Sequence, residues 1–399
     1  MITVEEALAA CLALTRVLPS ERVPLAEAAG RVLAEPVFAR RDQPPFSASA
    51  MDGYAVRGED ATAGARLTVI GEAPAGRAWH GEIGPGEALR IFTGAPLPRG
   101  ADRVVIQEDV TREADAIILG EALDTGPHVR PAGADFREGA RMEAPRRLTA
   151  ADLALAAAMN APDLAVTRKP VVALIPTGDE LVLPGETPRD DQIVASNTYG
   201  LKALVEAEGG AARLLPIARD DRESLEAVFG LASDADLIVT VGGASVGEHD
   251  LVGEVAGGLG LDRAFYKIAM RPGKPLMAGR LGDAALLGLP GNPVSALVCG
   301  HLFLVPMLRA FLGLKAGERR RRRARLGADL GPNGPREHYM RAEVFPTGEM
   351  PEIVPFGSQD SSLLSILSRA NGLIVRPIGD GPRRAGEIVE YLPLGPIAE

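Results

Sequence analysis

Hydrophobic and polar positions at the start of the chain follow helical spacing. Thr3 and Glu6 form a capping box, and apolar residues then recur every three or four positions to about Leu18. We expect one helix over this stretch and a second, short helix over 25–33.

Between residues 51 and 129 the hydrophobic pattern changes to short apolar runs separated by Gly, Pro and Asp. Such runs predict the strands of a small β module. Thr149 then begins a helical pattern that continues to Met159 and is apolar on nearly all sides. We therefore expect the β module to be inserted between helical segments.

From Lys169 onward, fully apolar runs alternate with helical patterns. We expect strands at 171–175, 213–217, 236–241, 264–269, 275–279 and 284–288, and helices at 197–208, at 221–231 and from Asn292 onward. This alternation, with strands that are apolar on both faces, predicts a mainly parallel, doubly wound α/β sheet. Such sheets bind ligands at the carboxyl ends of their strands.

The last part of the chain returns to short strands and turns. Apolar runs at 322–326, 338–344, 352–355, 372–377 and 387–391 predict a C-terminal β domain that resembles a small barrel. The expected organisation is a discontinuous helical linker domain (1–39 and 139–168), an inserted β module (40–138), an α/β domain (169–316) and the C-terminal β domain (317–399).

Charge and cysteine content narrow the class of protein. A formal net charge of −10 argues against nonspecific nucleic-acid binding, which needs a basic face. The basic run Arg319–Arg323 is either a solvated domain edge or a surface that captures an anionic ligand or partner. Cys11 and Cys299 lie far apart in apolar helical patterns, so we expect two buried thiols and neither a disulfide nor a metal site.

Two segments bear on the cellular compartment. The N-terminus is acidic and lacks the basic and apolar regions of a secretory signal. The most apolar helical stretch, Val294–Leu308, contains His301 and Pro306, which predicts a buried core helix and not a membrane span. We therefore expect a cytoplasmic protein with no nucleic-acid and no membrane partner.

Four loops at predicted strand ends of the α/β domain concentrate glycines and polar residues. They span 176–180, 240–250, 267–275 and 289–295. Gly242, Gly243 and Gly247 would let the backbone approach a ligand closely, and Thr240 and Ser245 add hydroxyl donors.

Charged side chains in and near these loops complement one another. Lys267, Arg271 and Lys274 offer positive charge to an oxyanion, and the helix after Asn292 adds the partial positive charge of its amino end. Hard oxygen ligands for Mg²⁺ come from four carboxylates, Asp179, Glu180, Asp220 and Asp250. A set of anion-binding groups beside carboxylates indicates a reaction of phosphoryl groups or oxyanions and not hydride transfer.

One motif supports a different class of enzyme. Gly243–Gly247 reads Gly-x-Ser-x-Gly, as in the nucleophile elbow of serine hydrolases, and it follows a predicted strand. A hydrolase also needs a histidine at the site, but His301 lies in an apolar helix and His338 lies in the β domain. The hydrolase interpretation is therefore the weaker one.

Several motifs together resemble one known family. Thr240–Asp250 reads Thr-x-Gly-Gly-x-Ser-x-Gly-x-x-Asp and resembles the molybdopterin-binding signature shared by MoeA-type and MogA-type proteins. Only MoeA-type proteins also have counterparts of the remaining motifs, which are Ser49–Ala55, Phe92–Ala95, Gly100–Asp102, Arg130–Asp135, Thr177–Leu181, Leu289–Ser295, Gly357–Ser362 and Ala370–Gly372. The resemblance covers essentially the whole chain.

The resemblance to MoeA-type molybdenumtransferases implies an L-shaped, four-domain homodimer. It also implies that adenylylated molybdopterin and molybdate react, with Mg²⁺, to give the molybdenum cofactor and AMP. The implied acidic residues at the site are Asp52, Asp135, Glu180, Asp220 and Asp250, with Glu180, Asp220 and Asp250 as metal ligands, and the implied basic pair is Lys267 and Arg271. The implied binding residues for pterin and molybdate are Thr177, Asp179, Thr240, Gly242, Gly243, Ser245, Gly247, Lys274, Pro290, Asn292, Pro293, Ser295, Arg336 and Ser361.

Two positions depart from the family pattern. Arg271 stands where the family commonly has Lys, and Tyr266 stands where it favours Trp. A guanidinium is a planar fork and an ammonium is a point charge, so the role of Arg271 stays open.

Related activities are weaker alternatives. A MogA-type adenylyltransferase is a compact single domain, and a scaffold of the gephyrin kind would carry further linker or partner domains. Molybdate and tungstate are nearly isosteric, so the sequence does not separate them. The partners that the resemblance suggests are a MogA-type adenylyltransferase and proteins that load molybdoenzymes.

Overall fold

The computed structural model describes residues 1–243, 251–317 and 321–395, and the chain divides into two compact units. One unit comprises 1–21, 30–34 and 166–399, and the other comprises 22–29 and 35–165. Each unit has its own hydrophobic clusters. The finer domain boundaries expected from the sequence stay predictions.

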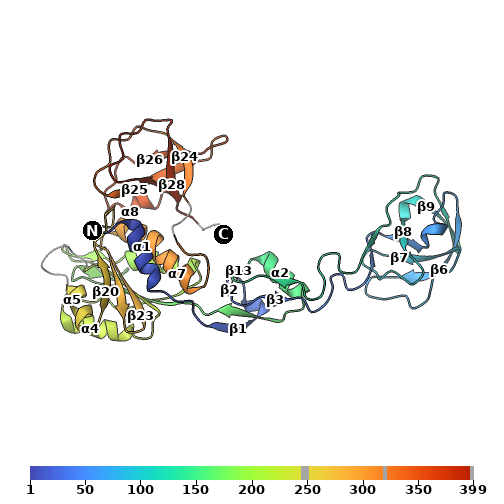
Figure 1. The fold of residues 1–399 in the computed structure, drawn as a ribbon, viewed down its shortest axis with the longest axis horizontal. Helices are drawn as coiled ribbons and strands as arrows, with labels where there is room; N and C mark the ends of the chain where they lie inside the picture. Colours follow the sequence, from blue (N-terminus) through green and yellow to red (C-terminus); the bar gives the residue numbers. More distant parts are fainter. Residues whose placement is uncertain (244–250, 318–320, 396–399) are drawn as a thin grey trace. The chain divides into compact units, whose positions relative to one another are not determined.

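A six-stranded sheet forms the centre of the first unit (Figure 1). Its strand order is β18 (Ala211–Leu214), β15 (Val171–Pro176), β19 (Leu237–Val241), β23 (Ala284–Leu289), β22 (Met277–Leu281) and β20 (Asp262–Tyr266). The first four strands are mutually parallel, whereas β22 is antiparallel to both of its neighbours. The carboxyl ends of β15, β19, β23 and β20 therefore lie at one edge of the sheet.

Successive residues of these strands point to opposite faces, and helices cover both faces. Val172 and Leu174 of β15 lie in one core cluster, whereas Ala173 and Ile175 lie in another. The first cluster takes residues from α1 (Val4–Ala13), α3 (Asn197–Ala207), α6 (Pro293–Cys299) and α7 (Val305–Phe311), and the second from α4 (Arg222–Leu231) and α5 (Leu251–Gly258). Figure 1 shows α4 and α5 across the sheet from α1 and α7, which confirms the predicted doubly wound arrangement.

The helix that begins at Pro293 continues through a π-helical turn, Gly300–Leu304, into α7. Among the described residues this stretch, Pro293–Phe311, is the one helix long and apolar enough to cross a membrane, but 78% of its most apolar window is buried inside the protein. Such burial is that of a core helix, as predicted. Cys299 in this helix and Cys11 in α1 are buried thiols, and burial raises the pKa of both.

Five strands of the C-terminal part close into a barrel. Around the barrel they are β25 (Glu337–Phe345), β26 (Glu352–Pro355), β24 (Arg322–Leu326), β28 (Ile388–Pro393) and β27 (Gly372–Arg376), and β27 pairs back with β25. Leu326, Ile353 and Tyr391 lie in its core. The two-residue strand β21 (Met270–Arg271), which follows β20 in the chain, extends this sheet by pairing in parallel with β25. The barrel-like C-terminal domain predicted from the sequence is confirmed.

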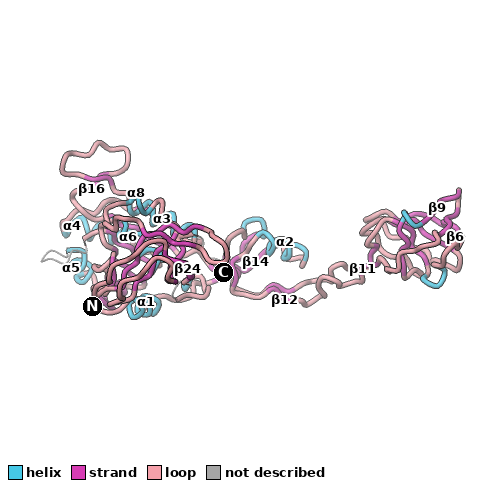
Figure 2. The backbone as a smooth tube through the Cα atoms, turned by 90° about the horizontal axis from the view of Figure 1, so that it is seen from above, coloured by secondary structure: helices cyan, strands magenta, loops and turns pink. Residues whose placement is uncertain are grey.

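Three short elements flank the sheet edge. The strands β16 (Leu181–Val182) and β17 (Ile193–Val194) pair in parallel, and Figure 2 shows the chain between them as a long loop. The helix α8 (Leu364–Leu367) follows a loop of the barrel domain.

The second unit contains the predicted β module. Its six-stranded sheet has the order β8 (Arg103–Ile106), β5 (Gly53–Val56), β7 (Glu87–Ile91), β6 (Arg66–Ala73), β10 (Ala116–Leu119) and β9 (Val110–Glu113). Two strand pairs join β11 (Val129–Arg130) to β4 (Ala48–Ser49) and β12 (Arg141–Met142) to β3 (Val37–Phe38). This unit also contains β13 (Arg146–Arg147), the helix α2 (Ala150–Ala158), and the 3₁₀ turns η1 (Leu25–Glu27), η2 (Gly58–Asp60) and η3 (Gln107–Asp109). The strand β2 (Val32–Leu33) belongs to the first unit, and the residues of β1 (Ser20–Pro24) and β14 (Asp163–Thr167) are divided between the two units.

The helices expected near the N-terminus were partly wrong. The helix α1 ends at Ala13 and not near Leu18. The segment 25–33 is a single 3₁₀ turn followed by the two-residue strand β2, and Gly30 between them has a φ of 69°. A right-handed helix cannot continue through a residue with this left-handed conformation. Apolar spacing over nine residues fits both arrangements, so the pattern could not separate them.

Candidate active site

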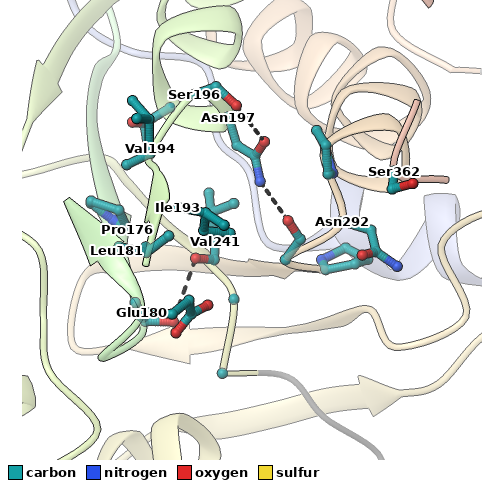
Figure 3. A pocket seen from close by; sticks show the side chains of 18 of the residues that line it. Pro176, Glu180, Leu181, Ile193, Val194, Ser196, Asn197, Val241, Asn292 and Ser362 are labelled. Carbon is teal, nitrogen blue, oxygen red and sulfur yellow. Dashed lines mark hydrogen bonds between the residues drawn. The ribbon is translucent and has the colours of Figure 1, made fainter. Parts of the chain in front are cut away.

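A cavity of about 590 Å³ lies at the edge of the α/β sheet where three parallel strands end (Figure 3). Pro176 ends β15, Val241 ends β19, and Pro290 follows β23. The other walls come from the β16–β17 pair and from the beginnings of α3 and α6. The cavity therefore lies where doubly wound sheets bind ligands, and its volume suits a small molecule.

Gly242 and Gly243 bring the loop after β19 against neighbouring parts of the chain. Their φ angles are 105° and 63°, a region that residues with a side chain rarely adopt. A Cβ atom on Gly242 would lie 2.5 Å from the carbonyl oxygen of Thr177, and one on Gly243 would overlap Val252 Cγ2. Both glycines line the cavity, but the close approach that requires glycine is to the protein's own chain.

Two helices begin at the cavity wall. Asn197 is the first residue of α3, and Pro293 is the first residue of α6, with Asn292 at its N-cap. The side-chain amide of Asn197 donates a hydrogen bond of 2.6 Å to the Gly291 carbonyl oxygen, which ties the two helix starts together (Figure 3). Amino ends of helices carry unpaired N–H groups and partial positive charge, so this wall suits an anionic group.

Three of the predicted acidic residues of the α/β domain, Asp179, Glu180 and Asp220, lie in the described part of the chain. Glu180 lines the cavity, as does the predicted binding residue Thr177. Asp179 accepts a hydrogen bond of 3.1 Å from the backbone N–H of Asp220, so these two predicted residues are adjacent. Among the described residues, no three His, Cys, Asp or Glu side chains are grouped closely enough to hold a metal ion.

A second cavity of about 420 Å³ shares Pro275 and Asn292 with the first. Besides Asn292, it brings together five other residues predicted from the sequence, which are Arg271, Lys274, Ser295, Arg336 and Ser361. Gln359 and Asp360 also line it. Its wall thus combines the loop after β20, the first turn of α6 and two segments of the barrel domain, with three cations and one carboxylate.

The barrel-domain loop that contains Ser361 is fixed to the start of α6. The Asn292 side-chain amide donates to Ser361 Oγ at 3.1 Å, and the Val294 N–H donates to the Ser361 carbonyl oxygen at 3.1 Å. Asp360 accepts hydrogen bonds from the backbone N–H and the hydroxyl of Ser362, and both lower the pKa of Asp360. The loop therefore has a defined shape where the two cavities meet.

Two buried residues of the barrel domain, His338 and Arg341, lie next to residues that line the second cavity. Burial, and then the charge of Arg271, lowers the pKa of His338 to about 4, so this imidazole is neutral near pH 7. Arg341 is almost completely buried, and its guanidinium donates to the carbonyl oxygens of Leu363 at 3.1 Å and Ser358 at 3.4 Å. Burial lowers the pKa of Arg341, but a guanidinium keeps its charge in proteins. The surroundings of the cavity are therefore positive.

Two further predicted residues of the α/β domain line neither cavity. Thr240 is completely buried in β19, and its hydroxyl has no hydrogen-bond partner in the part of the chain that the structure describes. The Lys267 Nζ lies 4.7 Å from the centre of the Tyr266 ring and does not line either cavity. Ser245, Gly247 and Asp250 lie outside the described residues.

The remaining predicted acids, Asp52 and Asp135, belong to the second unit. Asp52 accepts hydrogen bonds from the Thr93 N–H at 2.8 Å and the Thr93 hydroxyl at 2.7 Å, and both lower the pKa of Asp52. Asp135 donates its backbone N–H to the Gln43 carbonyl oxygen at 2.9 Å. Their roles stay predictions.

Three parts of the chain match family descriptions: 2–160 the MoeA N-terminal region (domains I and II), 173–310 a probable molybdopterin binding domain, and 323–394 the MoeA C-terminal region (domain IV). The molybdopterin molybdenumtransferase of Nostoc sp. is 37% identical over 387 residues, which are 94% of this chain and 89% of that protein. The chain belongs to the MoeA family of molybdopterin molybdenumtransferases. Two solved structures of MoeA proteins from Pyrococcus horikoshii are similar to this chain. The first has a TM-score of 0.84 and 33% identity and covers 98% of both chains. The second has a TM-score of 0.83 and 28% identity and covers 98% of this chain and 99% of its own. The family resemblance and the fold class expected from the sequence are confirmed.

Two residues at the site of this MoeA-family chain were missed by sequence reasoning. Asn197 joins the two helix starts, and Arg219 Nη1 donates to three carbonyl oxygens of the loop that carries Glu180. Asn197 stands in the first turn of a predicted helix, and Arg219 stands just before a helix cap, where polar residues are ordinary. Nothing in the pattern distinguished them from surface residues.

Proposed function

We propose that the chain inserts molybdenum into molybdopterin. In the proposed reaction adenylylated molybdopterin and molybdate give the molybdenum cofactor and AMP, with Mg²⁺. Membership of the MoeA family supports the transferase class. The arrangement of the site supports a reaction that joins a large ligand to a small oxyanion.

The observation that carries the proposal is the pair of cavities that share Pro275 and Asn292. The first has apolar walls from Leu181, Val241 and several prolines, and it has two helix amino ends. These features suit a flat heterocycle that carries phosphate. The second cavity has three cations, and it suits molybdate.

Molybdate is a dianion, and a dianion that leaves water needs fixed charge and directed donors. Arg271, Lys274 and Arg336 supply the charge, and the hydroxyls of Ser295 and Ser361 supply donors. Because His338 is neutral near pH 7, it adds no positive charge of its own beside these cations. Lys267 lines neither cavity, and its proposed part in the reaction rests on the family resemblance alone.

The residues present also suit Mg²⁺. This ion usually takes one or two carboxylates and completes its shell with waters and substrate phosphates. Glu180 provides one carboxylate that lines the first cavity, and Asp220 and Asp250 are the further ligands that we propose. When bound there, Mg²⁺ would neutralise charge on the phosphates that are cleaved.

We further propose a homodimer in which Asp52 and Asp135 of one subunit contribute to the site of the other. The proposed compartment is the cytoplasm. A MogA-type adenylyltransferase would deliver the substrate, and proteins that load molybdoenzymes would accept the product. These proposals rest on the family resemblance.

The direct test is incubation of the purified chain with adenylylated molybdopterin, Mg²⁺ and molybdate. We expect release of AMP together with cofactor that activates a molybdenum-free apoenzyme. A parallel reaction with tungstate measures the preference between the two oxyanions. Absence of both AMP and active cofactor would reject the proposed reaction.

Mixed dimers test the shared site. An Asp52→Ala chain and an Asp220→Ala chain are each expected to be inactive. If sites combine residues of two subunits, mixing the chains should restore part of the activity. A monomer by light scattering, or no recovery in verified mixed dimers, would contradict the shared site.

A further inference from the structure

We infer that Arg219 is a positioning residue, which holds the Thr177–Leu181 loop so that the Glu180 carboxylate faces the first cavity. The inference rests on the proposed function only for its kinetic consequence. Its structural part concerns the shape of one loop and can be measured without substrate.

Three carbonyl oxygens of the loop converge on one nitrogen of Arg219. Its Nη1 atom donates to Asp179 O at 3.0 Å, Leu181 O at 3.1 Å and Gly178 O at 3.4 Å. A trans peptide points its C=O and its N–H in opposite directions. By fixing these carbonyls, Arg219 therefore sets the orientation of the peptide group that precedes Glu180 and of the one that follows Leu181.

The position of the Glu180 carboxylate depends on this backbone. The side chain folds back over Gly178 so closely that a Cβ atom on Gly178 would overlap its carboxylate oxygens. The Glu180 carbonyl oxygen also accepts the Ile193 N–H at 2.8 Å, and Ile193 lines the cavity. A change in the loop would therefore move both a carboxylate and an apolar wall of the cavity.

The segment that carries Arg219 is anchored without its side chain. The Arg219 N–H donates to Ser224 Oγ at 2.9 Å, and Asp221 caps α4 by accepting the Ser224 N–H at 2.8 Å. The Ala218 N–H donates to Pro176 O at 2.9 Å. Replacement of the guanidinium should therefore leave α4 and the sheet in place and affect the loop.

Two substitutions separate charge and donors from bulk. Arg219→Met keeps a long side chain but removes every donor. Arg219→Lys keeps a cation with three donors, which can serve the same carbonyl oxygens. The matched control is Arg222→Met, because Arg222 belongs to the same segment but pairs with Glu226 and Glu254 on the surface.

Hydrogen exchange of the intact dimer or monomer, without substrate, measures the structural part. We expect Arg219→Met to raise the exchange of the 178–182 amides at least about tenfold while the melting temperature changes little. Arg219→Lys should restore most of the protection, and Arg222→Met should leave it unchanged. Unchanged exchange in Arg219→Met, or an equal rise in Arg222→Met, would overturn the inference.

Kinetics measure the consequence. Loss of a residue that orients a metal-binding or catalytic group typically costs about 10–100-fold in metal affinity or activity. We expect Arg219→Met to lower kcat, or to raise the Mg²⁺ concentration for half-maximal rate, by such a factor, with the KM for molybdate within about threefold. A change confined to the KM for molybdate would overturn the inference. An inactive wild-type protein would reject the proposed function instead, and the exchange experiment would still decide the role of Arg219.

Discussion

The two cavities that meet at Pro275 and Asn292 are built in different ways. The first is formed by the ends of neighbouring strands and by the turns that follow them in the chain. The second combines a loop of the α/β domain with Arg336 and with the Gln359–Ser361 segment of the barrel domain. The first is thus a product of local topology, and the second is a product of domain packing.

Because they are built from different parts of the chain, the two cavities offer different groups to a ligand. Among its described residues, the first offers helix amino ends, apolar walls and the carboxylate of Glu180, which a metal ion can bind. The second offers fixed positive charge to a ligand that brings its own negative charge. We therefore expect changes in the first cavity to affect the chemical step and changes in the second to affect capture of the oxyanion.

The largest effect is expected for Glu180→Gln. It removes a predicted metal ligand that lines the first cavity, and loss of such a ligand should lower kcat for AMP release by about a hundredfold or more. The KM for molybdate should stay within about twofold. Steady-state AMP release against molybdate concentration measures both quantities. A normal kcat with a raised KM for molybdate would instead assign Glu180 to binding of the oxyanion.

A smaller effect is expected for Lys274→Gln in the second cavity. Hydrogen bonds to a charged group contribute about 1.5–3 kcal/mol, so the KM for molybdate should rise roughly thirtyfold. High molybdate should restore most of the rate. Lys267→Gln is the matched control, because Lys267 lines neither cavity, and its KM should change only about threefold. Equal effects of the two substitutions would mean that the cavity wall does not define the oxyanion site.

Gly243→Ala tests how rigid the wall of the first cavity is. The added Cβ would overlap Val252 at a φ of 63°, and such strain should lower the free energy of unfolding by about 2 kcal/mol. Gly291→Ala is the control, since its nearest neighbour would be Gly242 Cα at an ordinary 3.5 Å. Denaturant titration measures both variants. If the two variants were equally stable, the loop after β19 would be able to shift and accommodate the added Cβ atom of Gly243→Ala.

The smallest effect concerns pH and the second cavity. The pKa of His338 is lowered from 6.5 to about 4, so between these values the unfolded chain binds a proton that the folded chain does not. Stability from this group is present above pH 6.5, falls as pH decreases and is lost by pH 4. The loss at pH 5.5 should be about 1 kcal/mol relative to pH 7.5, and His338→Gln should not show it. The same pH dependence in that variant would assign the loss to other groups.

The sequence predicted the parts of the site that local pattern determines. Thr177, Glu180 and Gly242 follow apolar strands, and parallel strands bring such loops to one edge. The role of Arg219 could not be predicted from the sequence, because its partners are backbone carbonyl oxygens. Every residue has such an oxygen, so the residue types of the loop do not indicate an arginine partner. Arg336 was identified only through the family resemblance.

The fold was predicted wrongly where the hydrophobic pattern of a short segment is compatible with two kinds of secondary structure. The stretch 25–33 contains apolar residues at helical spacing, yet it forms a turn and a strand. The isolated β21 was not predicted either, because two residues carry no periodicity and their partner β25 lies far along the chain.

The strand β21 also restricts how members of this family can exchange domains. Its two residues, Met270 and Arg271, belong to the α/β part of the chain but take their register from Glu337 and His338 of the barrel. A barrel grafted from a relative would have to present the same edge at the same register, or the guanidinium of Arg271 would be displaced from the cavity it lines. Substitutions in the other barrel strands should therefore be tolerated more easily than changes in the part of β25 that pairs with β21. A chimaeric protein should keep Arg271 at its cavity only if the register of this pair is preserved.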